Sequence, residues 1–269
     1  MRIIAVLNQK GGVGKTSLCH HLAGAYASAG ACVLLVDNDP QGPPRGVLGP
    51  ESAGQVPAAQ SVLAAYDQGW QCPALDVAWP GVEGASLVPG SPYLREVDRR
   101  DEPRAGLAEY LRGQAARFDL ALIDGPPGAG GCALSALAAA DHLLIPVQPE
   151  DFSAQGIAPV LEAAAPFFAE GGWASIVIGQ YQARITLHRL YVEAIRETHA
   201  FRVLDAMVPL LNDYREGIHL GLPVQQSKPK GSAAIAIRRL AAELAPRAGI
   251  PVRNPLALAD APAEAVHHG

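Results

Sequence analysis

Two lysines bracket a glycine-rich stretch near the start of the chain, NQKGGVGKTS (8–17). Glycines let backbone N–H groups approach phosphate oxygens closely, and a lysine at the end of such a loop reaches the β- and γ-phosphates of a nucleotide. A threonine directly after that lysine binds Mg²⁺ in such loops. The pattern therefore predicts a phosphate-binding loop with Lys15 on the phosphates and Thr16 on the metal, and it leaves Lys10 unexplained.

The surroundings of this loop fit the same interpretation. An apolar run (3–7) precedes it and a helical pattern (16–29) follows, so the positive N-terminus of the helix would point at the phosphates. The loop departs from the usual G-x-x-x-x-G-K-[ST] pattern, because Gln9 stands where the first glycine would fall. We expect the nucleotide to be surrounded by Lys10, Gly11, Gly12, Val13, Gly14, Lys15, Thr16 and Ser17.

Carboxylates follow two further apolar runs. Asp37 and Asp39 stand in DNDPQG (37–42), and Asp124 directly follows the run LALI (120–123). Ligands bind at the carboxyl ends of parallel strands, where such acids hold Mg²⁺ or its waters or orient an attacking water. The sequence therefore predicts a metal site with the residues Thr16, Asp37, Asp39 and Asp124.

The elements that must position these residues alternate along the chain. Short apolar runs typical of buried parallel strands lie between longer helical segments, which predicts an α/β fold with a doubly wound, mostly parallel sheet and helices on both faces. We expect a single domain over 1–250 and a flexible tail over 251–269, with loops at 40–57 and 68–92. The predicted strands are 3–7, 32–36, 86–88, 120–123, 142–147, 175–178 and 206–210, and the predicted helices are 16–29, 58–67, 104–117, 131–140, 153–169, 186–199 and 231–246.

The loop KGGVGKT resembles that of the deviant Walker A ATPases, the family that includes ParA, Soj and MinD. The resemblance continues through DNDPQG, through FDLALIDGPPG (118–128), and through 141–156, 180–187 and 216–224. It implies an ATPase that binds ATP and Mg²⁺ and closes into a homodimer with two ATPs between the subunits. Lys10 would then reach the partner's nucleotide, Asp39 would position or activate the water, and Asp37 would support the metal shell.

Two positions depart from the family pattern. Pro43 and Pro44 stand where the family often has asparagine after DPQG, which affects the expected mobility of this switch and not the binding of nucleotide. Ser135 replaces an asparagine often found in the helix after Asp124, and no role is assigned to it.

Charge is unevenly distributed over the chain, whose net charge is −5. Residues 1–179 are acidic, whereas residues 180–250 carry ten Lys/Arg against six Asp/Glu. Basic side chains on one face bind DNA phosphates regardless of sequence. Together with the resemblance, this favours nonspecific DNA binding and a cytoplasmic, nucleoid-associated protein. The candidate phosphate contacts are Arg184, Arg189, Arg215, Lys228, Lys230, Arg238 and Arg239.

The expected partners follow from the same resemblance. Too few residues precede the phosphate loop for a helix-turn-helix domain, so we expect a ParB-like or adaptor protein to supply specificity and to stimulate hydrolysis. Residues 248–269 carry only Arg253 and three prolines, which is not a basic amphipathic helix, so no membrane binding is expected. The cargo would be a plasmid, a chromosome origin or a protein assembly.

Three alternatives remain open. The first is a MinD-like, membrane-associated ATPase. The second is an Fe–S ATPase of the same superfamily, with Cys132 and Cys72 as ligands. The third is an ATP-dependent ligase, which would need a second substrate pocket. The four cysteines form no C-x-x-C pair and are expected to be reduced thiols, and the adjacent residues His20 and His21 face different ways on a helix, so they are expected to pack rather than bind one metal.

Overall fold

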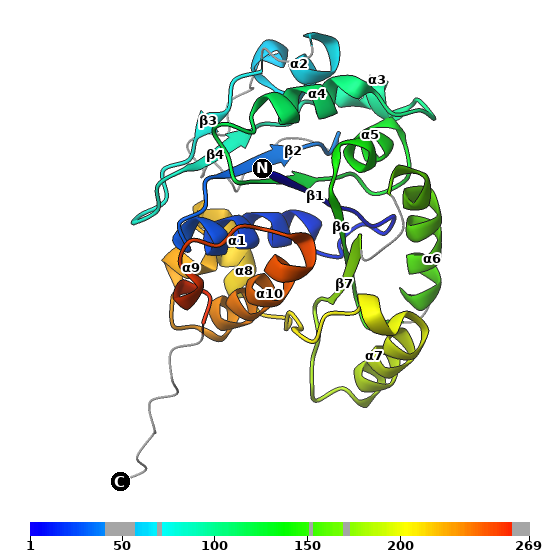
Figure 1. The fold of residues 1–269 in the computed structure, drawn as a ribbon. Helices are drawn as coiled ribbons and strands as arrows, with labels where there is room; N and C mark the ends of the chain where they lie inside the picture. The colour runs from blue at the N-terminus through cyan, green and yellow to red at the C-terminus, as the bar shows by residue number, and fades with distance from the viewer. Residues whose placement is uncertain (41–56, 69–71, 151–152, 169–172, 260–269) are drawn as a thin grey trace.

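The structure, a computed structural model, describes residues 1–40, 57–68, 72–150, 153–168 and 173–259. Its centre is a seven-stranded sheet in the order β3-β4-β2-β5-β1-β6-β7 (Figure 1). All neighbouring strands run parallel except β3, which pairs antiparallel with β4. This confirms the predicted doubly wound, mostly parallel α/β fold. The strands are β1 (Arg2–Val6), β2 (Val33–Asp37), β3 (Leu75–Asp76), β4 (Ala85–Val88), β5 (Leu120–Asp124), β6 (His142–Val147) and β7 (Ala174–Ile178).

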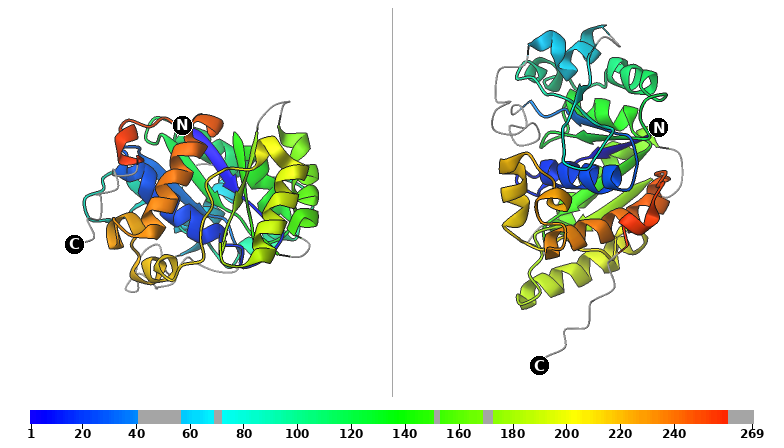
Figure 2. Two further views of the ribbon diagram at one scale, coloured as in Figure 1. Left: turned by 90° about the horizontal axis from the view of Figure 1, so that it is seen from below. Right: turned by 90° about the vertical axis from the view of Figure 1, so that its left-hand side faces the viewer.

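Helices cover both faces of this sheet, as the views in Figures 1 and 2 show. On one face α1 packs against α8, α9 and α10, and on the other α4 packs against α2 and α5, and α6 against α7. The helices are α1 (Lys15–Ser28), α2 (Val62–Gln68), α3 (Leu94–Asp98), α4 (Ala105–Gly113), α5 (Gly131–Ala139), α6 (Ser153–Ala164), α7 (Thr186–His199), α8 (Asp213–Leu220), α9 (Val224–Ser227) and α10 (Ser232–Ala248).

The strands are buried because both sheet faces are covered. Alternate residues of β1 enter opposite cores: Ile3 and Ala5 pack under one layer of helices, and Ile4 and Val6 under the other. Side chains of a strand point alternately to the two faces, so a strand between two helix layers must be apolar at every position. This explains why the strands near the centre could be read from the sequence as continuous apolar runs.

The predicted strand 206–210 is wrong. The Val208 N–H of this segment donates to the Ile178 carbonyl at the end of β7 at 2.8 Å, but no ladder forms. Only isolated bridges occur in this region, between Val203 and Ile176 and between Pro209 and Tyr181. Proline has no N–H to give to a strand ladder, so Pro209 weakens strand pairing at this edge of the sheet. The predicted strand 86–88 is confirmed as β4, and the expected loop over 68–92 also contains the short strand β3. The short helices α3, α8 and α9 were not predicted.

The C-terminal segment packs further than expected. Of the predicted flexible tail, residues 251–259 contact the domain: Leu258 is buried, Arg253 pairs with Asp119 at 2.8 Å, and the Asn254 N–H donates to the Ala29 carbonyl. The rest of that prediction, 260–269, and the prolines Pro43 and Pro44 lie outside the described residues.

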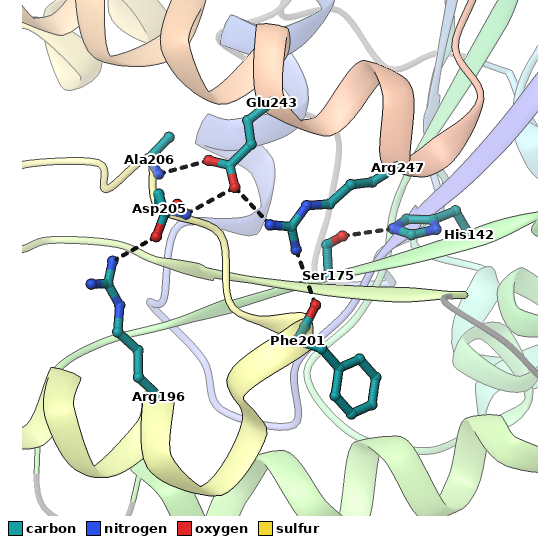
Figure 3. Close-up of polar contacts among 8 residues, drawn as sticks. All are labelled: His142, Ser175, Arg196, Phe201, Asp205, Ala206, Glu243 and Arg247. Carbon is teal, nitrogen blue, oxygen red and sulfur yellow. Dashed lines mark hydrogen bonds and ion pairs between the residues drawn. The ribbon is translucent and has the colours of Figure 1, made fainter.

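Polar contacts fix the segment after α7 against α10 (Figure 3). The Glu243 carboxylate accepts the backbone N–H groups of Asp205 at 2.9 Å and Ala206 at 2.8 Å, and it pairs with Arg247. Arg247 also donates to the Phe201 carbonyl at 3.1 Å. These contacts hold in place the chain that continues to Leu210 and Leu211, beside the phosphate loop.

Candidate nucleotide site

The loop between β1 and α1 has the backbone of an anion site. Gly12 and Gly14 have φ angles of 76° and 95°, which side chains rarely allow. A Cβ atom added at Gly11, Gly12 or Gly14 would meet nothing within 4 Å, so the glycine side of the loop is open. Gly14 precedes α1 and no side chain caps the helix there. The first N–H groups of α1 are therefore available to a phosphate.

Polar side chains at the ends of neighbouring strands hold this loop. Asn8 donates to the Pro146 carbonyl at 2.7 Å and accepts the Lys10 N–H at 2.9 Å. Gln148 and Gln180 follow β6 and β7, and both donate to the Gly12 carbonyl, at 3.2 Å and 2.7 Å. Sequence reasoning assigned no role to these three residues. Their only signal was that each directly or closely follows an apolar strand.

The two lysines of the loop have different surroundings. Lys15 is buried, its Nζ lies 3.3 Å from the Asn8 carbonyl and 3.2 Å from the Lys10 carbonyl, and burial lowers its pKa. Lys10 extends to the surface, where its Nζ pairs with Glu150 at 2.5 Å and both side chains are half exposed. Lys15 is thus placed for the phosphates of its own subunit, whereas Lys10 is accessible from outside the subunit.

Thr16 and Asp124 lie together below the loop. The Thr16 hydroxyl donates to Asp124 Oδ2 at 2.6 Å, and Asp124 Oδ1 is buried without a hydrogen-bond partner among the described residues. Burial raises the Asp124 pKa to about 7, Asp39 adds to the rise, and the Thr16 bond and Lys15 oppose it. A buried carboxylate oxygen without a donor and a neighbouring hydroxyl are ligands that suit Mg²⁺ or its waters.

Asp37 contacts the backbone on both sides of its own position in the site. Its carboxylate accepts the Gly90 N–H at 3.1 Å and the Asp39 N–H at 3.2 Å, and burial raises its pKa. A Cβ atom at Gly90 would lie 2.2 Å from Asp37 Oδ2, so only glycine allows this approach. Asp37 therefore organises the backbone around Asp39. No group of three or more His, Cys, Asp or Glu side chains within the described ranges could hold a metal by itself.

A cavity of about 180 Å³ opens beside the loop. Its walls are the loop with the start of α1 on one side, and the segment 208–218 with Gln180 on the other. This places room for the remainder of a nucleotide next to the phosphate position. The lining includes Gly12, Ser17, Gln180, Leu210, Leu211 and Arg215.

The predicted DNA contacts do not share one environment. Arg184 and Arg189 are exposed at the start of α7, where they donate to Gln182 and Thr186. Lys228 pairs with Asp213 at 2.6 Å and Glu216 at 2.7 Å, and these hydrogen bonds raise its pKa to about 12. The charge of Lys228 is thus already compensated. Of the others, Arg215 lines the cavity, Lys230 and Arg239 are exposed, and Arg238 donates to the Pro229 carbonyl.

The buried cysteines and histidines have structural environments. Cys72 and Cys132 are buried in the same apolar core, where their thiols lie against the carbonyls of Ser61 and Leu94. His21 accepts the Val224 N–H and lies 3.1 Å from the Tyr214 carbonyl. These contacts fit packing roles and offer an Fe–S cluster no surface position.

No helix in the described part of the chain combines the length and hydrophobicity that a membrane crossing requires.

Comparisons with known proteins agree with the loop and the fold. A family model described as an AAA domain matches residues 1–167. The chromosome-partitioning ATPase Soj of Thermus thermophilus is 34% identical over 92% of this chain and 96% of its own. The solved structure of apo McdA from Cyanothece superposes with a TM-score of 0.76 at 18% identity, over 91% of this chain and 99% of that one.

A further similar structure belongs to an enzyme of a different kind. Cobyrinic acid a,c-diamide synthase from Mycobacterium smegmatis, solved with an ATP analogue and magnesium, has a TM-score of 0.69 at 25% identity, over 91% of this chain and 94% of that one. The match to Soj extends over nearly the whole length of both chains at higher identity. The chain therefore belongs to the ParA/Soj/MinD family of P-loop ATPases.

Proposed function

We propose that this protein is an ATP-driven positioning switch of the ParA type. The observation that carries the proposal is the loop itself: a buried Lys15 and an accessible Lys10 on one glycine-rich turn, in a chain similar to Soj along nearly its whole length. The switch binds ATP with Mg²⁺, closes into a homodimer, and returns to single subunits when ATP is hydrolysed.

The residues of one subunit divide the work on the nucleotide. Lys15 and the first N–H groups of α1 bind the phosphates, and the hydroxyl of Thr16 with the free oxygen of Asp124 holds the metal. Mg²⁺, when bound, neutralises charge on the β- and γ-phosphates. Asp39 orients the attacking water, and Asp37 fixes the backbone that carries Asp39.

Lys10 contributes to the neighbouring subunit. Its ion pair with Glu150 is half exposed, and such pairs contribute little stability, so Lys10 can leave Glu150 at small cost. In the closed dimer Lys10 reaches the partner's nucleotide, which makes closure depend on ATP in both subunits.

The dimer binds DNA without sequence preference, and a partner protein stimulates hydrolysis. The basic excess of residues 180–250 supports this proposal. Arg184 and Arg189 are its best-placed cations, because both are exposed and donate to the uncharged Gln182 and Thr186 side chains. Two subunits bound together gain avidity for DNA, so dimerisation alone would switch binding on. The cargo would be a plasmid, a chromosome origin or a protein assembly.

The test is binding of Asp39→Ala to a random-sequence DNA duplex with ATP, with ADP and without nucleotide. We expect binding with ATP only, because the variant binds ATP and cannot hydrolyse it. Adding Arg184→Ala and Arg189→Ala should lower the slope of log K against log salt by about one for each lost phosphate contact. Arg95→Ala, an exposed arginine on α3, is the matched control and should leave the slope unchanged.

Binding that ignores nucleotide would contradict the switch. ATP-dependent binding to anionic vesicles and not to DNA would instead favour the MinD-like alternative. The similarity to cobyrinic acid a,c-diamide synthase motivates one more arm, in which ATP turnover is measured with and without cobyrinic acid. Turnover that requires this carboxylic acid would favour a ligase.

A further inference from the structure

Asn38, the residue between the two acids of DNDP, is fully buried, and both the nitrogen and the oxygen of its side-chain amide make hydrogen bonds. Its Nδ2 donates to the Cys132 carbonyl in the first turn of α5 at 2.9 Å, and its Oδ1 accepts the Tyr66 hydroxyl of α2 at 2.8 Å. Its backbone N–H donates to the Asp124 carbonyl at 2.9 Å. One residue thus contacts the end of β5 through its backbone and two helices of the same layer through its side chain.

We propose that Asn38 and Tyr66 are positioning residues that fix Asp39 relative to Asp124. The inference rests on the proposed ATPase function and adds a hydrogen-bond relay, Tyr66–Asn38–Cys132, that neither the family motif nor the loop geometry requires. Asp39 follows Asn38 directly, and its own N–H is held by Asp37. A change in the Asn38 side chain must therefore move the backbone that carries Asp39.

The surroundings of the relay argue against simple space filling. Tyr66 and Cys132 belong to an apolar core, where leucine or phenylalanine would pack without polar atoms. A polar side chain is costly in such a place unless its hydrogen bonds are made, and then it specifies one arrangement. Burial raises the Tyr66 pKa well above its usual value, so its hydroxyl stays a donor at any working pH.

The relay also reaches the loop after Asp124. Cys132 lies in the first turn of α5, directly beyond the stretch 125–130 that follows β5. On the other side of this turn, the buried Ser135 hydroxyl lies 2.5 Å from the Gly131 carbonyl and accepts the Arg104 N–H at 2.9 Å. The start of α5 is therefore bonded to the Asn38 side chain on one side and, through Ser135, to the Arg104 backbone on the other, and the Asn38 contact connects it to the residue before Asp39.

The experiment compares Tyr66→Phe, Asn38→Leu and the double variant. Misplacement of a water-orienting carboxylate by a fraction of an ångström should lower kcat for ATP about tenfold in each single variant. KM for ATP should stay within about twofold, because the loop that binds the phosphates is untouched. The kcat of the double variant should equal that of Asn38→Leu, since both changes break the same relay.

Tyr110→Phe is the matched control. Tyr110 lies in the same apolar core, and its hydroxyl is buried without a hydrogen-bond partner among the described residues. This variant should keep the wild-type kcat. If Tyr66→Phe also keeps it while Asp39→Ala abolishes turnover, the relay is overturned and the ATPase function stands.

A second measurement needs no turnover. Amide hydrogen exchange of the Asn38 and Asp39 N–H groups in the nucleotide-free protein should be at least about tenfold faster in Tyr66→Phe and unchanged in Tyr110→Phe. Equal exchange in both variants would contradict the relay even if the wild type hydrolysed no ATP. If exchange is faster in Tyr66→Phe but the wild type hydrolyses no ATP, the relay is supported and the proposed ATPase function is rejected.

Discussion

Thr16 donates a 2.6 Å hydrogen bond to Asp124, and this bond joins the first turn of α1 to the end of β5. The contact brings together two residues that stand 108 positions apart in the chain. It also uses only one of the two Asp124 oxygens, so the other remains for a cation or its water. The first prediction concerns this carboxylate.

Asp124→Asn should lose Mg²⁺-dependent nucleotide binding and gain stability. Because the pKa of Asp124 is raised from 3.8 to about 7, its carboxyl lowers the free energy of unfolding as the pH rises between these two values, and the loss is complete above about pH 7. An amide keeps an acceptor for Thr16 without the charge, so the free energy of unfolding at pH 8 should rise by up to about 4 kcal/mol. Urea unfolding without nucleotide measures the gain, and Mg²⁺ titration of fluorescent ATP binding measures the loss.

Asp37→Asn tests whether this effect is specific to Asp124. Asp37 is buried too, and its carboxylate is held by two backbone N–H groups. Its amide variant should bind nucleotide with nearly the wild-type dependence on Mg²⁺. An equal loss in both variants would contradict the separation of their roles.

The second prediction concerns the two residues of the surface ion pair. Lys10→Ala should abolish the ATP-dependent dimer, whereas Glu150→Gln should keep it, because the Glu150 side chain pairs with Lys10 of its own subunit. Light scattering after size-exclusion chromatography, with Asp39→Ala as the background to prevent hydrolysis, measures both. Both variants should unfold within about 1 kcal/mol of the wild type, since exposed pairs contribute little. A Lys10→Ala variant that still forms the dimer would contradict the role of Lys10 in trans.

The sequence predicted the loop and the central strands because their physical requirements leave marks in residue type. Gly12 and Gly14 must be glycine to adopt positive φ, and strands buried on both faces must be apolar throughout. Acids at the ends of β2 and β5 were equally visible. The shared position of strand ends in a parallel sheet then brought these residues to one site.

The remaining parts of the site depend on contacts that no local pattern records. Gln148 and Gln180 hold Gly12, and Asn38 meets Tyr66, only because distant segments pack together. For the same reason, composition counted Lys228 as a candidate DNA contact although two carboxylates already pair with it. The short helices α8 and α9 likewise owe their form to packing against α1 rather than to a long periodic pattern.

The third prediction concerns stability in acid. Burial lowers the pKa of His142 to about 4, with Arg2 and Arg247 adding to the effect, and its ring bonds the Ser175 hydroxyl at 2.9 Å (Figure 3). Between pH 6.5 and 4, His142 is protonated in the unfolded chain but stays neutral in the folded protein. The contribution of His142 to stability is therefore complete above pH 6.5 and falls by about 3 kcal/mol by pH 4.

His142→Gln isolates this contribution, because glutamine can still bond Ser175 but does not titrate. His20, with a pKa lowered to about 4, acts in the same direction, and Asp37 and Asp124, with raised pKa values, act in the opposite one. The wild type and His142→Gln share these groups, so their contributions cancel when the two free energies of unfolding are subtracted. The free energy of unfolding of the wild type minus that of the variant should fall as the pH falls through this window. A difference independent of pH would contradict a buried, neutral His142.

The last prediction concerns the segment after α10. Leu258 is 3% exposed and packs into the core beside α10, whereas Leu256, two positions earlier, is 82% exposed. Truncating a buried leucine removes its packing and leaves a cavity, so Leu258→Ala should lower the free energy of unfolding by about 2 to 3 kcal/mol. Leu256→Ala, the matched control, should change it by less than about 0.5 kcal/mol. Equal and small effects in urea unfolding would mean that the chain beyond residue 250 adds nothing to the fold, whereas the expected difference makes residues 251–259 part of the domain.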